Sequence, residues 1–353
     1  MKYSFIIPVY NRPDEVDELL QSLTEQELKD FEVVIVEDGS QKPCKDVCDK
    51  FADILDLHYY AKENGGPGQA RNYGAERAHG EWLIILDSDV VLPKGYLKAV
   101  EDGIRGERRE ERGEFAAFGG PDASHPSFTP VQKAISYSMT SFFTTGGIRG
   151  GKKKLDKFYP RSFNMGIRRD VYQQLGGFSK MRFGEDIDFS YRIVEAGYNP
   201  QLIPDAWVWH KRRTDFRKFF RQVYNSGIAR INLEKRHPGT LKLVHLLPMV
   251  FTVGVIALIL IAAVARAMIH YDAANWHTWY WICLLALSPI LFYSLIIFID
   301  SSIKNKSMKV GLLSVPAAFV QLMGYGFGFI ESWWKRCVMK KDEFQAFEKN
   351  FYK

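Results

Sequence analysis

Two groups of acidic residues have the spacing that metal and proton chemistry requires. Asp87 and Asp89 stand two residues apart, directly after the apolar run 82–86 (WLIIL). Carboxylates at the end of a strand can share a hard divalent cation, which neutralises a diphosphate as it leaves. More carboxylates crowd together at residues 185–188 (EDID), and such crowding raises carboxyl pKa values, as a general base requires. Each group alone is also typical of a turn or an acidic surface.

Three further residues are weaker candidates. Asp38 follows the apolar run 31–36 (FEVVIV), where it could bind a base or ribose or simply make an Asp-Gly turn. Arg71 lies one turn inside a helix that follows a glycine-rich loop, a place that suits a phosphate. His210 could be a metal ligand, although a lone histidine is more often structural. There is no GxGxxG after a strand and no GxxxxGK[ST], so dinucleotide and P-loop sites lack support.

The elements that would position these residues alternate along the first hundred residues. Short apolar runs predict buried strands at residues 5–7, 31–36, 57–60 and 82–86. A helical stretch begins at Pro13, and a second covers 68–78. This alternation predicts a mostly parallel sheet with helices on both faces, which binds ligands at the carboxyl ends of its strands. We therefore expect residues 8–12, 37–40 and 87–89 to lie together.

The last third of the chain contains three uncharged segments, at residues 246–265, 279–299 and 310–330. Each is about as long as the roughly 20 apolar residues that span a bilayer. Tryptophans near their ends suit the membrane–water boundary. A stretch that begins at Phe216 mixes aromatic and basic residues at helical spacing. It predicts either a helix on anionic headgroups or an ordinary surface helix on the soluble domain.

The distribution of basic residues predicts the topology. Lysines and arginines are frequent at 211–236, before the first segment, and absent from the loop 270–278. The positive-inside rule therefore places the residues before the first segment in the cytoplasm. A third crossing by 310–330 matches the length of one span and is the favoured expectation. The alternative is a re-entrant segment, because Pro316 and several glycines interrupt it and a third crossing would export Lys335 and its basic neighbours.

Composition narrows the remaining classes. The net charge of +6 is too small to imply nucleic-acid binding, and no nucleic-acid motif is visible. The four cysteines have no zinc-site spacing and are expected to be reduced thiols. The start of the chain reads as a strand rather than a signal peptide. The charged stretch 107–114 predicts a solvated helix end or loop, and the glycine-rich basic stretch 145–154 predicts either a lid over phosphates or a loop.

Six motifs occur in order over about residues 1–240: FIIPVYNR, VEDGS, NGGPGQARNYG, DSD, NMGIRR and GEDIDFSYRI. With them the chain resembles the family 2 glycosyltransferases, which have the Rossmann-like GT-A fold. The sequences GGP at 119–121, FRQVYNSGIARINLEKRHP at 220–238 and the following HLLP resemble the succinoglycan-biosynthesis subgroup, which has C-terminal transmembrane helices. Enzymes of that subgroup add sugars to lipid-linked oligosaccharides. Polyprenyl-phosphate sugar synthases usually carry a DADLQ-like segment, where this chain has DSDVV.

The resemblance implies roles for individual residues. It implies that the donor contacts are Pro8, Tyr10, Asp38, Arg71 and Asp87. It implies a Mg²⁺ or Mn²⁺ site at Asp89, completed in some relatives by a histidine that matches His210. It implies that Asp186 is the catalytic base with Glu185 beside it, and that the acceptor side is lined by Asn164, Met165 and Gly166.

These signals predict a GT-A catalytic domain at 1–215, a basic interfacial helix region at 216–242, a transmembrane region of about three helices at 243–335 and a tail at 336–353. The expected activity is inverting transfer from a nucleotide sugar to a saccharide on a polyprenyl diphosphate. The expected location is the cytoplasmic face of the inner membrane, in cell-surface polysaccharide assembly. Two alternatives are a sugar transferase to polyprenyl phosphate itself and a non-catalytic sugar-nucleotide sensor or scaffold. Association of chains into a homo-oligomer stays open.

Overall fold

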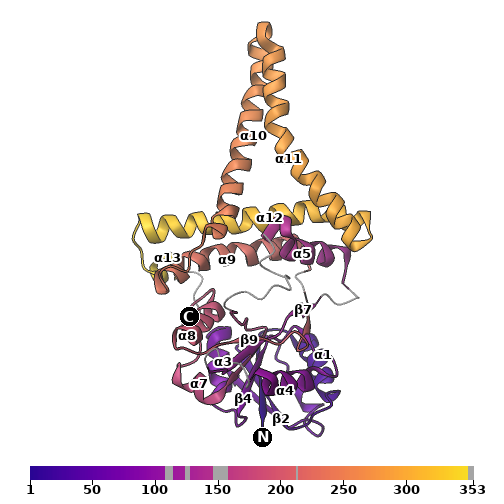
Figure 1. The fold of residues 1–353 in the computed structure, drawn as a ribbon, viewed down its shortest axis with the longest axis vertical. Coiled ribbons are helices and arrows are strands. Elements are labelled where there is room, and N and C mark those ends of the chain that lie inside the picture. Colours follow the sequence, from indigo (N-terminus) through magenta and orange to yellow (C-terminus); the bar gives the residue numbers. More distant parts are fainter. Residues whose placement is uncertain (108–113, 124–127, 146–157, 212–213, 349–353) are drawn as a thin grey trace. The chain divides into compact units, whose positions relative to one another are not determined.

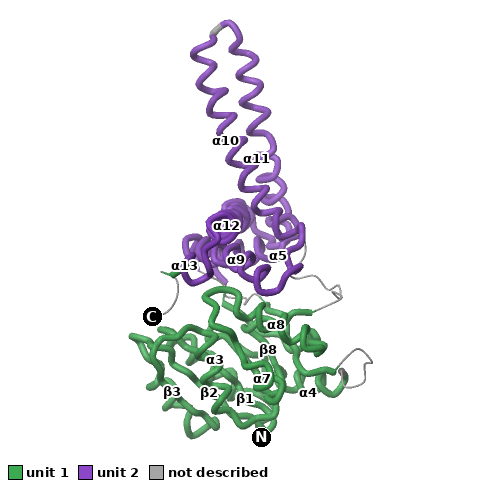
Figure 2. Tube along the Cα trace, turned by 90° about the vertical axis from the view of Figure 1, so that its left-hand side faces the viewer, with its two compact units in different colours: residues 1–126, 152–211, 347–353 green, residues 127–151, 212–346 purple. Residues whose placement is uncertain are grey.

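The computed structural model describes residues 1–107, 114–123, 128–145, 158–211 and 214–348 (Figure 1). The stretches 107–114 and 145–154, with their predicted loop or lid, lie almost wholly outside these ranges. The chain divides into two compact units, one of residues 1–126, 152–211 and 347–353 and the other of residues 127–151 and 212–346 (Figure 2). Each unit has hydrophobic clusters of its own.

The first unit is built on a seven-stranded sheet in the order β3-β2-β1-β4-β8-β6-β9. Its strands are β1 Tyr3–Val9, β2 Phe31–Asp38, β3 Leu57–Lys62, β4 Trp82–Leu86, β6 Ala117–Gly119, β8 Asn164–Arg168 and β9 Gln201–Leu202. The first four strands along the chain pair in parallel, and β8 joins β4 in the antiparallel direction. The predicted mostly parallel sheet and its four predicted strands are therefore confirmed.

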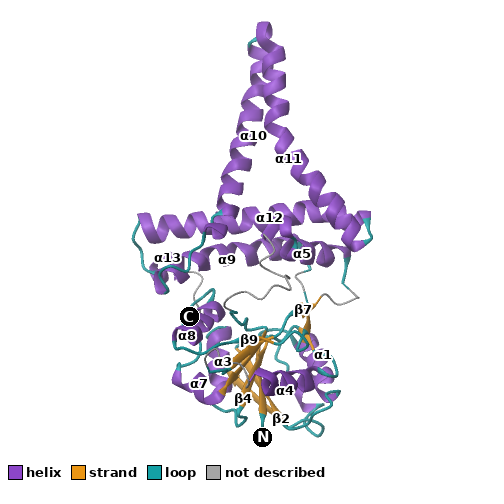
Figure 3. Cartoon of the chain, in the orientation of Figure 1, coloured by secondary structure: helices purple, strands orange, loops and turns teal. Residues whose placement is uncertain are grey.

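Helices cover both faces of this sheet (Figure 3). The side chains along each strand point alternately to one face and the other, so both faces are apolar. Phe5 and Ile7 belong to one buried cluster, with α1 Pro13–Thr24 and α4 Tyr96–Glu107. Ile6 points into the opposite cluster, with α3 Pro67–Ala75, α7 Arg169–Gln174 and α8 Glu185–Glu195. The short α2 Lys45–Asp49 adds to the first face. Successive strand residues point to opposite faces, so a strand buried on both sides reads as a continuous apolar run.

A smaller three-stranded sheet brings a distant segment to the end of β4. It consists of β5 Val90–Val91, β10 Val208–His210 and β7 Asp122–Ala123, with β10 in the middle. β10 pairs with β5 in the antiparallel direction, so that His210 lies opposite Val90. This pairing places a histidine beside the acidic residues that follow β4.

The second unit is helical. Its elements are α5 Pro130–Thr140, α6 Phe142–Thr145, α9 Phe216–Arg236, α10 Leu247–Tyr271, α11 Trp276–Asn305, α12 Met308–Trp333 and α13 Glu343–Phe347, with short 3₁₀ turns at Leu243–His245 and Ala273–Asn275 and a π turn at Trp334–Val338. All three predicted apolar segments form helices long and apolar enough to cross a membrane. Figure 1 shows α10 and α11 as a hairpin, with α9 and α12 running side by side across its open end.

The unit boundaries differ from the predicted domains most clearly at residues 127–151. Residues 127–151 fall within the predicted catalytic domain, but the part that the structure describes packs in the helical unit. Ile135 and Met139 of α5 form a buried cluster with Phe219 and Val223 of α9. The apolar face of α5 is thus covered by α9, a partner that the periodicity of α5 cannot reveal.

Candidate active site

Asp87, Asp89 and His210 form one potential metal site. Their ligand atoms all lie within 4.8 Å of one another. Asp89 Oδ1 is 3.2 Å from His210 Nε2, and the His210 ring stacks on Phe163 with 5.1 Å between centroids. Two carboxylates and an imidazole suit a divalent cation such as Mg²⁺ or Mn²⁺. The structure therefore brings together the three residues that the sequence proposed for the diphosphate end of the site.

Arg12 already neutralises one of these carboxylates. Its Nη1 lies 2.6 Å from Asp89 Oδ2. The preceding Asn11 has a positive φ of 55°, an uncommon conformation for a residue other than glycine, and its Oδ1 accepts bonds from the amides of Gln41 and Lys42. The loop after β1 is thus fixed so that Arg12 faces the metal site. Arg12 is the last residue of the FIIPVYNR motif, and its position in the sequence alone predicted no role for it.

Arg71 joins the metal site to the acidic start of α8. Its Nη2 lies 2.8 Å from Asp87 Oδ1, and its Nη1 lies 3.1 Å from Glu185 Oε1. The guanidinium is buried and lies 5.2 Å from the ring centroid of Phe178. Gly184 has a φ of 85° and allows the sharp turn from which α8 begins with Glu185. Arg71 thus links the two acidic groups that the sequence singled out, although it was expected to meet a phosphate.

Asp186 is held by a different arginine. Arg161 Nε lies 2.6 Å from Asp186 Oδ2. Burial alone would raise the pKa of Asp186, but the charge and hydrogen bond of Arg161 outweigh burial and lower it. The pKa of Glu185 is raised by burial and by the neighbouring Asp186 charge. The predicted effect of crowding on the pKa therefore holds for Glu185 but is reversed at Asp186, because Arg161 pairs with Asp186. No local pattern in the sequence predicts this pair.

The third carboxylate of this group has a structural position. Asp188 is buried, accepts a hydrogen bond from Ser179 at 2.8 Å and pairs with Arg192 one turn later at 3.1 Å. It holds α8 in place and lies apart from the contacts of Glu185 and Asp186.

The donor-side residues after β1 and β2 differ in exposure. Tyr10 is half exposed, which leaves its ring open for stacking on a base, and Pro8 precedes it in β1. Asp38 is buried, and its carboxylate accepts bonds from the amides of Gly65 and Gly66 and from Lys62 Nζ. Asp38 therefore fixes the glycine-rich loop before α3. Any contact with a nucleotide would come in addition to this role.

The proposed acceptor-side residues lie inside the sheet. Asn164, Met165 and Gly166 are all fully buried in β8, between β4 and β6. The Asn164 side chain accepts a bond from the Tyr96 hydroxyl and donates one to the carbonyl oxygen of Ala206. The side chains of these residues are thus part of the core, and the acceptor role of this segment stays a prediction.

The sequence of residues 4–176 matches the family described as Glycosyl transferase family 2. This chain contains a family 2 glycosyltransferase domain. The chain is 26% identical over 240 residues to the glycosyltransferase AglE of Haloferax volcanii, covering 65% of this chain and 73% of AglE. It is 38% identical over 102 residues to the poly(ribitol-phosphate) β-N-acetylglucosaminyltransferase TarS of Staphylococcus aureus, covering 28% of this chain and only 18% of TarS.

The fold has a counterpart among solved structures. The mannosyltransferase PcManGT of Pyrobaculum calidifontis, solved with GDP-Man and Mn²⁺, aligns with a TM-score of 0.54 at 16% identity and covers 95% of this chain and 88% of its own. This likeness shows a common fold. It confirms the predicted Rossmann-like GT-A fold. The family match over residues 4–176 confirms the predicted family 2 domain, and the structure itself contains the three long apolar helices that follow it.

Proposed function

We propose that this chain is a membrane-bound inverting glycosyltransferase. It moves a sugar from a nucleotide-diphosphate sugar to a saccharide carried on a polyprenyl diphosphate, at the cytoplasmic face of the inner membrane, in cell-surface polysaccharide assembly. One observation carries the proposal: Asp87, Asp89 and His210 form a candidate cation site that Arg71 joins to Glu185, whose neighbour in α8 is Asp186. A diphosphate end and a proton-accepting end then lie within one site.

At the diphosphate end, Asp89 and His210 would hold Mg²⁺ or Mn²⁺, with Asp87 facing the sugar. When bound, the cation supplies charge that stabilises the departing diphosphate. Arg12 now bonds to Asp89, and its side chain is partly exposed, so it can turn from the carboxylate toward a phosphate oxygen. Tyr10 offers an exposed ring for the base, and Asp38 holds the loop 64–66 through hydrogen bonds.

At the other end, Asp186 accepts the proton of the acceptor hydroxyl. The hydroxyl oxygen forms its bond to the anomeric carbon from the face opposite the diphosphate. The bond from that carbon to the diphosphate oxygen breaks, and the nucleoside diphosphate leaves with the electron pair. The bond from Arg161 keeps Asp186 ionised, which a base requires, and the partly exposed Arg161 must release it before the proton moves.

The lipid acceptor is supported by the apolar helices. α10 and α11 are long enough to cross a bilayer, and the rest of the chain buries only a small part of each. The basic residues of α9 precede α10, which supports a cytoplasmic catalytic domain, where nucleotide sugars are made. A lipid-linked substrate would be delivered to such an enzyme at the same membrane surface.

The test is a donor screen with the full chain in membrane lipid extract, measuring released nucleoside diphosphate over a panel of nucleotide sugars. We expect one donor to be turned over and the Asp186→Asn variant to be inactive with it. A second arm replaces the extract with bare polyprenyl phosphate. Turnover there without any saccharide acceptor would indicate the sugar transferase to polyprenyl phosphate, and no turnover of any donor would favour the non-catalytic alternative.

A further inference from the structure

α9 and α12 are joined along most of their length in one register. Ser332 Oγ donates to the carbonyl oxygen of Ile228 at 3.1 Å, and Arg336 Nε donates to Asn232 Oδ1 at 2.8 Å. Both pairs are separated by 104 residues in the sequence. A constant separation means that α9 and α12 run in the same direction, side by side.

Glycines bring the two helices into close contact. A β-carbon at Gly227 would lie 2.2 Å from the carbonyl oxygen of Tyr325, and one at Gly328 would lie 2.0 Å from that of Tyr224. Small residues at a helix interface allow this approach of the backbones. The third apolar helix is accordingly the most enclosed of the three: 44% of its most apolar 18-residue stretch is buried, against 17% and 11% for the corresponding stretches of the first and second helices. α12 is therefore packed on protein over more of its surface than either of the other two helices.

α9 cannot cross a bilayer. It carries Arg217, Lys218 and Arg221 in its first two turns and Lys235 and Arg236 in its last turn. Charged side chains are costly in the hydrocarbon core, and a helix charged at both ends and on one face belongs at the interface. Because α12 is fixed to α9 from Phe220 to Asn232, α12 must lie at the same depth.

Among the described residues, the side-chain hydrogen bonds and ring contacts between α12 and the hairpin lie toward the open end of the hairpin. Thr252, close to the start of α10, contacts Leu322, and Ser301, close to the end of α11, bonds to Ser314 at 2.7 Å. The innermost ring contact of α12 is between Phe319 and Tyr293. A third span antiparallel to α11 would continue toward the hairpin tip, whereas Figures 1 and 3 show α12 running across the base of the hairpin.

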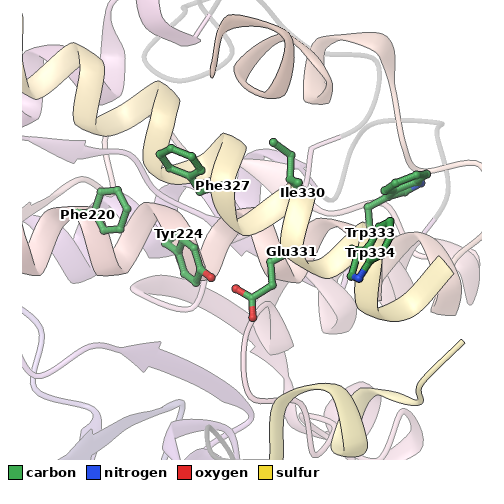
Figure 4. Close-up of a pocket in the computed structure, with 7 residues that line it drawn as sticks. All are labelled: Phe220, Tyr224, Phe327, Ile330, Glu331, Trp333 and Trp334. Carbon is green, nitrogen blue, oxygen red and sulfur yellow. The ribbon is translucent and has the colours of Figure 1, made fainter. Parts of the chain in front are cut away.

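The exposed side of the pair has the composition of a membrane–water boundary. A groove of about 550 Å³ lies between the helices, and its lining residues are Phe220, Tyr224, Phe327, Ile330, Glu331, Trp333 and Trp334 (Figure 4). Glu331 pairs with Lys335 at 2.6 Å, so the charges in this region are compensated. Tryptophan and tyrosine concentrate at the headgroup level, where their rings meet acyl chains and their polar groups meet water.

We propose that α9 and α12 lie together in the plane of the membrane surface, in contact with bilayer lipids, and that only α10 and α11 cross. This arrangement replaces the third crossing favoured from the sequence. It places the segment after α12 on the same side as the catalytic domain, where Arg236 at the end of α9 pairs with Glu343 at 3.1 Å. It also keeps Lys335, Arg336 and Lys340 inside, as the positive-inside rule requires.

The first test is labelling of single cysteines by a membrane-impermeant maleimide in intact cells and in opened membranes. The background is the full chain with Cys283→Ser and Cys337→Ser, since Cys44 and Cys48 are buried. The three sites are Ile54→Cys in the catalytic unit, Tyr271→Cys at the hairpin tip and Lys341→Cys after α12, all exposed. We expect site 341 to behave as site 54 and oppositely to site 271. Labelling of 341 together with 271, or of all three together, overturns the proposal.

The second test separates an in-plane helix from one that dips into the bilayer and returns. Spin labels at Leu312→Cys and Phe327→Cys, toward opposite ends of α12, are compared with Leu260→Cys on α10, all at exposed positions in a vesicle of phosphatidylethanolamine and phosphatidylglycerol. Collision with oxygen and with a polar nickel chelate reports depth. We expect both α12 labels to be shallow and the α10 label to be deep. An α12 label as deep as that at residue 260 contradicts an in-plane helix.

Discussion

At each end of the site a partly exposed arginine pairs with one carboxylate, whereas at its centre a buried arginine pairs with two. Arg12 covers Asp89 with 30% of its side chain exposed, and Arg161 covers Asp186 with 39% exposed. Arg71 in the centre is only 4% exposed and bonds to both acidic groups. The buried arginine therefore fixes the distance between the two ends, while the exposed arginines occupy positions that the proposed cation and acceptor would take. The metal end and the base end should consequently fail in different ways when mutated.

The largest effect is expected at the metal end. Asp89→Ala removes the carboxylate that Arg12 and His210 share, so the charge of the leaving diphosphate is no longer neutralised. We expect turnover to fall by about 10³-fold or more, since several kcal/mol of stabilisation are lost. Excess chelator should have the same effect on the unmodified enzyme. Full activity in excess chelator would show that turnover does not need a cation.

A change at the base end should lower the rate of transfer and leave donor affinity nearly unchanged. Asp186→Asn preserves the shape of the side chain and removes its basic lone pair. Transfer should fall by about 10²–10⁴-fold, the usual contribution of a general base. Single-turnover measurements with saturating donor isolate this step. The control is Asp188→Asn, which changes a buried carboxylate of the same helix that bonds to Ser179 and Arg192 outside the site. An equal loss of transfer in the control would mean that Asp186→Asn acts by disturbing α8 and not by removing a base.

Arg12 should compete with the cation for Asp89. Without it, Mn²⁺ should bind more tightly in the absence of donor, by up to about tenfold, because a charge-assisted hydrogen bond no longer has to break. Calorimetry of Mn²⁺ with Arg12→Ala measures the change directly. Arg12→Lys retains the charge, and its affinity for Mn²⁺ should lie between those of the unmodified protein and Arg12→Ala. The control is Arg105→Ala, which removes an exposed charge that pairs with Glu101 in α4. Equal Mn²⁺ affinities in all four proteins would mean that Arg12 does not compete with the cation for Asp89.

The smallest expected effect is a shift in pH dependence at the base end. Arg161 lowers the pKa of Asp186, so its removal raises that pKa. Activity needs ionised Asp186, and the acid limb of the kcat/KM profile should therefore move to higher pH in Arg161→Ala. At pH values above this limb the profile should change little in shape. Arg161→Gln, which keeps a hydrogen-bond donor without the charge, should show most of the shift. An acid limb that stays in place would mean that another group controls it.

The sheet and one end of the site could be predicted from the sequence because local patterns determine them. Runs such as FEVVIV are buried on both faces and read directly as strands, and parallel strand ends bring Asp38 and Asp87 to one edge. His210 depended on β5 and β10, whose two and three residues are too short to show a period. Its assignment came from the family resemblance alone.

Long-range partners could not be predicted. Arg161 and Asp186 are separated by 25 residues, and nothing in the types of their neighbours shows that they pair. Asn164 matched a motif, yet β8 buries it among Tyr96 and Ala206. Likewise, the length of 310–330 suited a span, while the packing of α12 on α9 depends on Gly227 and Gly328 meeting backbone from a distant segment.

The central claim is that donor binding belongs to the metal end and proton transfer to the base end. Calorimetry of the donor found in the screen, with Mn²⁺ present, tests it most directly in two variants. Asp186→Asn should bind the donor with nearly unchanged affinity, and Asp89→Ala should show no measurable binding. Loss of binding in both variants would make Asp186 a binding residue and contradict the division of the site.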